Sequence, residues 1–250
     1  MKMKKPLIII IVLILAVGLY LYLANAYTYY MFNRTGLKAP AAQHSYEFNG
    51  EATGESLKYA ALGDSLTSGM GLNKYEDSFP YLLAKDLSSD GKKVSLKNFS
   101  YPGYRTDDLI ENLLDQSITS NPQIITLLIG INDIHGFYSQ EKFKKNYQFI
   151  LDRLTKETKA KIYAVSLPYI GDDVFIAPFN YYSSQRTAEF NEIIKELAKG
   201  YNITYIDIAE PTKAIFSQDK FYYALDEFHP SAAGQALWEK IIFDNITLGR

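Results

Sequence analysis

Residues 121–133 read NPQIITLLIGIND, and this stretch decides the fold class. Apart from Thr126, every residue from Ile124 to Ile129 is apolar. The helix-breaking pair Asn121-Pro122 precedes the run and a glycine follows it, so the run has the length of a strand. A continuous apolar strand is typical of a parallel sheet that is covered by helices on both faces.

Comparable apolar runs recur along the chain and alternate with longer amphipathic segments. The runs predict further strands at residues 59–62, 94–99, 162–166 and 203–208. The amphipathic segments predict helices at residues 79–87, 106–116, 141–156, 184–199 and 232–243. This alternation indicates an α/β protein, a flavodoxin-like three-layer α/β/α sandwich with a five-stranded parallel sheet. In such folds ligands bind beyond the carboxyl ends of the strands. We therefore expect the functional residues in the loops that directly follow the strands.

Composition narrows the function classes. The chain has 250 residues, a formal net charge of −2 and no cysteine. The absence of cysteine excludes disulfides, thiol nucleophiles and cysteine metal sites. Nucleic-acid binding usually requires a basic patch or stripe, and nothing in the sequence indicates one.

The N-terminus predicts one transmembrane helix. Lys2, Lys4 and Lys5 precede an apolar run from Leu7 to Ala26, which is long enough to cross a bilayer. The lysines favour a cytoplasmic N-terminus, so the rest of a single-pass protein in the cell membrane would be extracytoplasmic. The alternative is a secreted protein, because residues 24–26 resemble a signal-peptidase site and cleavage near Ala26 would release the chain.

The domain boundaries follow from these patterns. Residues 1–30 are expected to form the membrane anchor or signal segment. Residues 31–56 contain Gly36, Pro40, Gly50 and Gly54 without a sustained period, which predicts a linker. Residues 57–250 then form the α/β domain.

Polar loops follow the first three predicted strands. The first loop, at residues 63–69, reads GDSLTSG and offers Ser65 as a nucleophile, if a base removes its proton. The second contains Gly103, whose backbone N–H is unobstructed, and the third contains Asn132, whose amide could stabilise an oxyanion. Each signal alone is weak, because the same residues are frequent in ordinary turns.

A histidine with a carboxylate three residues earlier supplies the missing base. His229 follows Asp226 in the sequence DEFHP, just before the last predicted helix. The carboxylate can hold one ring nitrogen and leave the other for the serine.

Taken together and in this order, the loops resemble the conserved blocks of the SGNH (GDSL-like) hydrolases over roughly residues 57–244. Ser65, Gly103 and Asn132 match the serine, glycine and asparagine blocks, and Asp226 with His229 matches the last block. The sequence departs from the family at Glu227, where glycine is frequent, and at Ser231, where asparagine is frequent. Residues 169–182 match no motif, and we expect them to shape the substrate pocket.

The resemblance implies a membrane-anchored bacterial serine esterase. Ser65, His229 and Asp226 would be catalytic, and Ser65, Gly103 and Asn132 would form the oxyanion hole. No cofactor or metal is implied. Candidate substrates are lysophospholipids, acylglycerols and O-acetylated glycans. An acyltransferase acting on cell-envelope glycan and a non-catalytic glycan- or lipid-binding module are the alternatives. The oligomeric state stays open.

Overall fold

The computed structural model describes residues 5–34, 44–49, 56–89, 91–169 and 179–246. Within these residues the sheet has six strands in the order β1-β3-β2-β4-β5-β6. The strands are β1 (Ser45–Phe48), β2 (Leu57–Gly63), β3 (Val94–Ser100), β4 (Ile124–Leu128), β5 (Lys161–Val165) and β6 (Thr204–Ile206). Strands β3, β2, β4, β5 and β6 are mutually parallel, and their order is that of flavodoxin-like sheets, as predicted.

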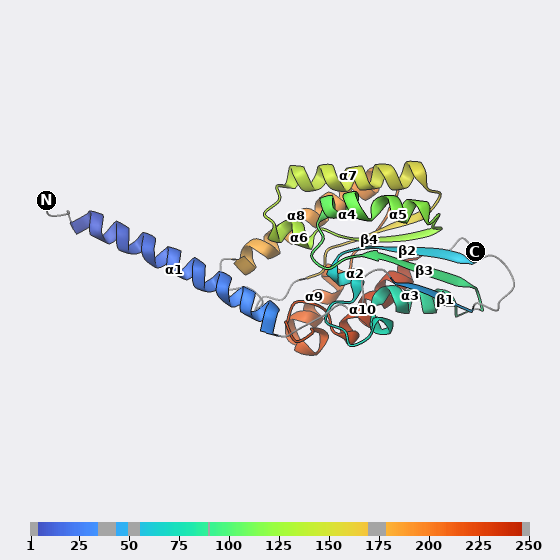
Figure 1. Ribbon diagram of the computed structural model, residues 1–250, viewed down its shortest axis with the longest axis horizontal. Coiled ribbons are helices and arrows are strands. Elements are labelled where there is room, and N and C mark those ends of the chain that lie inside the picture. The colour runs from blue at the N-terminus through green and yellow to red at the C-terminus, as the bar shows by residue number, and fades with distance from the viewer. Residues whose placement is uncertain (1–4, 35–43, 50–55, 90, 170–178, 247–250) are drawn as a thin grey trace.

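Helices cover both faces of the sheet, which confirms the three-layer sandwich (Figure 1). One face carries α3 (Phe79–Leu87), α9 (Ala209–Gln218) and α10 (Ala232–Asn245), and the other carries α4 (Thr106–Asn112), α5 (Leu114–Thr119), α7 (Gln140–Glu157) and α8 (Phe179–Gly200). Shorter helical segments follow the strands or join them: α2 (Ser65–Ser68), η1 (Tyr75–Asp77), α6 (Ile131–His135) and η2 (Lys220–Tyr222).

The prediction of a purely parallel, five-stranded sheet was wrong in one respect. Strand β1 lies within the segment predicted to be a linker and pairs with β3 in the antiparallel direction. The physical reason is a short alternating pattern: Tyr46 and Phe48 turn inward, while Ser45 and Glu47 are exposed. The inward rings pack on Tyr81, with ring centroids 4.9 and 5.0 Å away, so the edge strand is held by aromatic contacts.

Two helical regions also differ from the prediction. The helix expected over residues 106–116 is divided into α4 and α5 at Leu113. Arg105 stands at the N-cap position of α4, so the helix begins at Thr106. Helix α9 was not predicted, because Pro211 interrupts its pattern, although proline is tolerated in the first turn of a helix.

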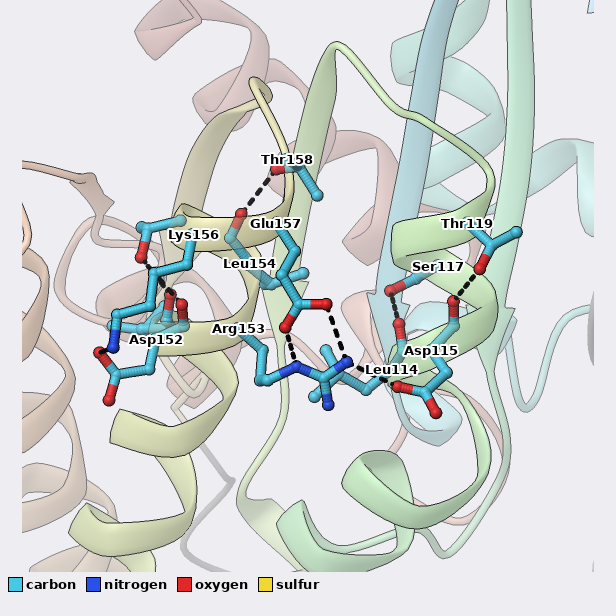
Figure 2. Close-up of polar contacts among 12 residues, drawn as sticks. Leu114, Asp115, Ser117, Thr119, Asp152, Arg153, Leu154, Lys156, Glu157 and Thr158 are labelled. Atoms are coloured by element: carbon cyan, nitrogen blue, oxygen red, sulfur yellow. Dashed lines mark hydrogen bonds and ion pairs between the residues drawn. The ribbon is translucent and has the colours of Figure 1, made fainter.

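The outer helices are connected by polar contacts at the surface (Figure 2). Arg153 on α7 donates from Nη2 to Asp115 Oδ1 on α5 at 2.8 Å and also pairs with Glu157 one turn further along α7. Exposed pairs of this kind contribute at most about 1 kcal/mol each. The layer is therefore held mainly by the buried apolar residues beneath it.

Helix α1 (Lys5–Arg34) lies apart from the sandwich. Its residues Lys5–Tyr27 are long and apolar enough to cross a membrane, by length and composition. Its apolar side chains are almost all exposed, in contrast to those of a helix in a protein core. In Figure 1, α1 extends beyond the end of the domain at which α2, α6 and α9 lie.

A buried carboxyl group on α10 makes the fold sensitive to pH. Glu239 is 7% exposed, and its Oε1 has no hydrogen-bond partner among the described residues. Burial, together with the negative charges of Asp86 and Asp244, raises the pKa of Glu239 to about 7. The folded state therefore holds this proton more tightly than the unfolded chain, and its stability falls as the pH rises from the unfolded pKa towards 7 and above.

We expect Glu239→Gln to stabilise the protein progressively as the pH rises from 5 to 8.5. The gain over this range should be about 2 kcal/mol, since each pKa unit is worth about 1.4 kcal/mol. This corresponds to a rise in melting temperature of about 4–8 °C relative to wild type. Thermal unfolding at the two pH values measures it, with the exposed Glu111→Gln as control. A gain independent of pH would show that Glu239 has the same pKa in the folded and the unfolded protein.

Candidate active site

Three loops meet at the carboxyl end of the sheet because of the register of the central strands. Gly63, the last residue of β2, pairs with Ser100 of β3 on one side and with Leu128 of β4 on the other. The segments that follow these three residues carry Ser65, Gly103 and Asn132. The structure thus starts all three predicted loops from neighbouring strands, with the serine segment in the middle.

Ser65 begins the short helix α2, directly after β2. Asp64 caps this helix, since its Oδ1 accepts from the backbone N–H of Leu66 at 3.0 Å. A Cβ at Gly63 would collide with the Thr67 hydroxyl and the Leu128 carbonyl, so only glycine allows the strand to turn this sharply into the helix. The side chain of Ser65 is fixed on a turn and is only 5% exposed.

His229 joins the serine to a carboxylate. Its Nε2 lies 2.9 Å from Ser65 Oγ, and its Nδ1 lies 2.5 Å from Asp226 Oδ2. A carboxylate only accepts hydrogen bonds, so the proton of a neutral imidazole resides on Nδ1 and Nε2 accepts from the serine. All three side chains are buried, although Ser65 and Asp226 are 161 positions apart in the sequence.

The Asp226 carboxylate remains ionised in this setting. Burial acts to raise its pKa, but the hydrogen bond and positive charge of His229 outweigh this effect. Two backbone donors contribute as well: Oδ1 accepts from the N–H groups of Phe228 and His229 at 3.1 and 3.0 Å. The pKa of Asp226 is consequently lowered from its ordinary value.

Glu227, the first departure from the family pattern, occupies a strained position in this turn. Its φ is 58°, in the left-handed region where glycine has no steric cost. This explains why glycine suits the position. The side chain of Glu227 is held by Lys220, whose Nζ donates to its Oε2 at 2.8 Å. The second departure, Ser231, caps α10 with its hydroxyl, as an asparagine there would.

Gly103 and Asn132 occupy the segments after β3 and β4. Gly103 has a φ of 84°, and a Cβ there would meet nothing within 4 Å, so backbone conformation rather than space demands glycine. Asn132 lies on α6 and donates from Nδ2 to the Tyr104 carbonyl at 3.0 Å. An amide nitrogen carries two protons, which leaves one of them for a ligand.

Three further titratable groups surround these residues. Burial raises the pKa of Asp64 to about 7 and that of Asp133 to about 6. Asp133 accepts from the backbone N–H of Thr106 at 3.0 Å and from its hydroxyl, so it connects α6 to α4 as a structural group. His135 is half-buried beside Phe228. Burial and the nearby His229 lower the pKa of His135 to about 4.

Gln235 supports the site, and its role was missed in the sequence. From α10, its Nε2 donates to the Leu66 carbonyl at 3.0 Å, and its Oε1 accepts from the Phe79 N–H at 2.9 Å. Asn98 acts similarly from β3, donating to the Thr67 carbonyl at 3.1 Å. Both side chains are buried and hold α2 in place. Residues 170–178, most of the segment expected to shape the pocket, lie outside the described residues.

Comparison with known proteins places this geometry in a family. The family model described as GDSL-like Lipase/Acylhydrolase matches residues 61–237. Spore germination lipase LipC of Bacillus licheniformis is 29% identical over 213 residues, which cover 74% of this chain and 95% of LipC.

Solved structures share the fold. The lipase/acylhydrolase from Enterococcus faecalis superposes with a TM-score of 0.62 at 21% identity, covering 76% of this chain and 94% of that one. The acetylxylan esterase Axe2 from Geobacillus stearothermophilus gives a TM-score of 0.64 at 17% identity, covering 80% of this chain and all of Axe2. The family model spans well over half of the chain, so the protein belongs to the GDSL-like lipase/acylhydrolase family and is a hydrolase that acts on ester bonds.

Proposed function

We propose that the protein is a serine esterase that cleaves carboxylic esters through an acyl-enzyme on Ser65. The observation that carries this proposal is the position of His229, which lies 2.9 Å from Ser65 Oγ and 2.5 Å from Asp226 Oδ2. A buried serine with no base in reach is a weak nucleophile, whereas this imidazole can remove its proton. Asp226 fixes the ring and stabilises the imidazolium that forms.

The proposed reaction has two stages. Ser65 Oγ attacks the ester carbonyl carbon while its proton passes to His229 Nε2. The imidazolium then protonates the leaving alcohol as the ester C–O bond breaks, which leaves the acyl group on Ser65. Water, deprotonated by the same nitrogen, attacks the acyl-enzyme and releases the carboxylic acid and the free serine.

The oxyanion is proposed to bind where the loops after β2, β3 and β4 converge. The donors are the backbone N–H groups of Ser65 and Gly103 and the free amide proton of Asn132. The helical turn that begins at Ser65 supports this role, because the first N–H groups of a helix have no intrahelical partner.

The proposed substrate classes are lipid esters, such as lysophospholipids and acylglycerols, and O-acetylated glycans. The relative LipC is named a lipase, which favours lipid esters. We further propose that α1 anchors the protein in the cell membrane with the catalytic domain outside. An unbroken helix supports the anchor, since every backbone group of a spanning segment must be hydrogen bonded within it.

Hydrolysis of p-nitrophenyl esters from acetate to palmitate tests the function. The full chain is purified in detergent and assayed beside Ser65→Ala. Activity that disappears in the variant supports the proposal, and the preferred chain length separates deacetylation from lipid cleavage. A folded protein that acts only when a sugar acceptor is added would be a transferase. A folded protein inert in both assays would be a binding module.

Asn132→Ala tests the oxyanion hole. We expect a folded variant whose kcat falls by about 10²–10³, as is typical when one oxyanion donor is lost. Steady-state kinetics on p-nitrophenyl acetate measures this, with the exposed Asn112→Ala on α4 as the matched control. A kcat within a factor of three of wild type would remove Asn132 from the mechanism.

A further inference from the structure

Exposed apolar side chains gather around the candidate active site. Outside α1, the large apolar side chains that are exposed within the described residues are Tyr101, Phe137, Phe149, Tyr181, Phe221, Leu225 and Phe243. All except Phe149 and Phe243 come from segments at the carboxyl ends of strands or next to the Asp226 turn. We call these five residues the apolar rim: Tyr101, Phe137, Tyr181, Phe221 and Leu225.

The rim residues adjoin the site residues in sequence and in space. Leu225 directly precedes Asp226 and is 73% exposed. Tyr101 opens the loop that contains Gly103, and its N–H donates to the Gly63 carbonyl at 3.3 Å, beside the start of α2. Phe137 directly follows α6, the helix of Asn132, after the connecting Gly136. The rim residues therefore lie on segments that adjoin those carrying the site residues.

Phe137 is held outward at a conformational cost. It is 66% exposed, and its φ of 56° lies in the left-handed region, which a bulky residue seldom occupies. Its ring lies tilted by 38° against the ring of Tyr182 of α8, with centroids 5.5 Å apart. A strained backbone that presents an aromatic ring to solvent is a common mark of a binding surface.

The position of the rim relative to α1 identifies its occupant. Helix α1 leaves the domain at the end where α2, α6 and α9 lie, which is the end that carries the site (Figure 1). When α1 spans the bilayer, the end of the domain that carries the candidate active site therefore faces the membrane surface. Exposed Tyr, Phe and Leu side chains are favoured at the boundary between headgroups and acyl chains.

We propose that the apolar rim docks on the surface of the membrane that holds α1, so that the esterase takes its substrate, an acyl lipid, directly from the bilayer. This inference rests on the proposed function and narrows its substrate class to membrane lipids. Docking brings the ester carbonyl of a lipid close to the segment of Ser65 while the acyl chain stays in an apolar environment. No acyl chain then has to cross water to reach Ser65.

Fluorescence quenching in nanodiscs tests the docking. The chain contains no cysteine, so Leu225→Cys can be labelled without removing native thiols. The labelled full chain is placed, one copy per disc, in phosphatidylcholine nanodiscs that contain a lipid-borne nitroxide quencher. We expect strong quenching at position 225 and little at the control position, Phe243→Cys, on the last turns of α10. Equal quenching at the two positions would overturn the proposal. So would quenching at position 225 that appears only when several copies share one disc, because a second copy rather than the bilayer would then cover the rim.

The hydrolysis rates of rim variants provide a second test of the docking proposal. In phosphatidylcholine vesicles, the double variant Phe137→Gln/Phe221→Gln should hydrolyse an embedded lysophospholipid about tenfold more slowly than wild type, because it loses two apolar contacts with the bilayer. Its rate on soluble p-nitrophenyl acetate should be unchanged. The matched control is Phe149→Gln/Phe243→Gln, expected to retain both rates. If Ser65-dependent acetate hydrolysis persists but the rim variant keeps its lipid rate, the docking proposal fails and the esterase proposal stands.

Discussion

Replacement of Ser65 by alanine is expected to lower kcat/KM for p-nitrophenyl acetate by about 10⁴-fold or more. The only side-chain hydrogen bond of Ser65 is the one to His229, and no other hydroxyl is positioned on that nitrogen among the described contacts. The alanine variant therefore keeps the fold and loses the group that would carry the acyl chain. Steady-state kinetics together with thermal unfolding measures both effects.

Ser68→Ala is the matched control for this experiment. Ser68 lies on the same short helix, is buried, and donates to the Ser65 carbonyl at 3.1 Å, so its removal tests the helix rather than the nucleophile. Its activity should stay within about tenfold of wild type, because one backbone contact contributes about 1 kcal/mol. A Ser65→Ala enzyme that retained a tenth of the wild-type rate would require another nucleophile.

Asp226→Asn is expected to reduce kcat by about 10⁴-fold while leaving the protein folded. The asparagine oxygen can keep the two backbone N–H bonds that Oδ1 accepts, so its amide nitrogen then faces His229 Nδ1. That nitrogen donates, which forces the imidazole proton onto Nε2. The ring would then be unable to accept the proton of Ser65.

The tautomer of His229 distinguishes this explanation from general damage to the site. Nitrogen NMR of the histidine ring should show the proton on Nδ1 in wild type and on Nε2 in the variant. Asp219→Asn, on the exposed neighbouring turn, is the control and should keep full activity. Loss of activity with an unchanged tautomer would mean that Asp226 acts mainly through its charge.

The parallel core of the fold could be predicted because its strands are continuous apolar runs bounded by turn residues. Ile124–Leu128, for example, is buried at every position. Strand β1 was not predicted because it has only four residues. Its alternating pattern becomes meaningful only when the aromatic residues against which it packs, distant in the sequence, are known. Likewise, α9 begins with a proline in its first turn, which resembles a loop until the tertiary packing is known.

The sequence was sufficient to select the residues of the candidate site, but it could not predict the distances and contacts between them. Ser65, Asp226 and His229 could be selected from their loops, but no local pattern states that the hydroxyl and the imidazole meet at 2.9 Å. Gln235 has no sequence signal at all, because a glutamine one turn into a helix is ordinary. Its role depends on α10 packing against the start of α2. The left-handed conformation of Glu227 was equally hidden, since few residues reveal their φ by identity.

The distance in sequence between the two halves of the site sets the time at which activity appears. Ser65 and His229 are 164 positions apart, and the helix that braces α2 through Gln235 is the last one of the described chain. Chains are synthesised from the N-terminus, and contacts between remote segments form late in folding. Until residues 226–235 have been synthesised, Ser65 of the nascent protein thus remains a hydroxyl without its base. The nascent chain therefore cannot hydrolyse an ester before α10 has been synthesised and has packed against α2.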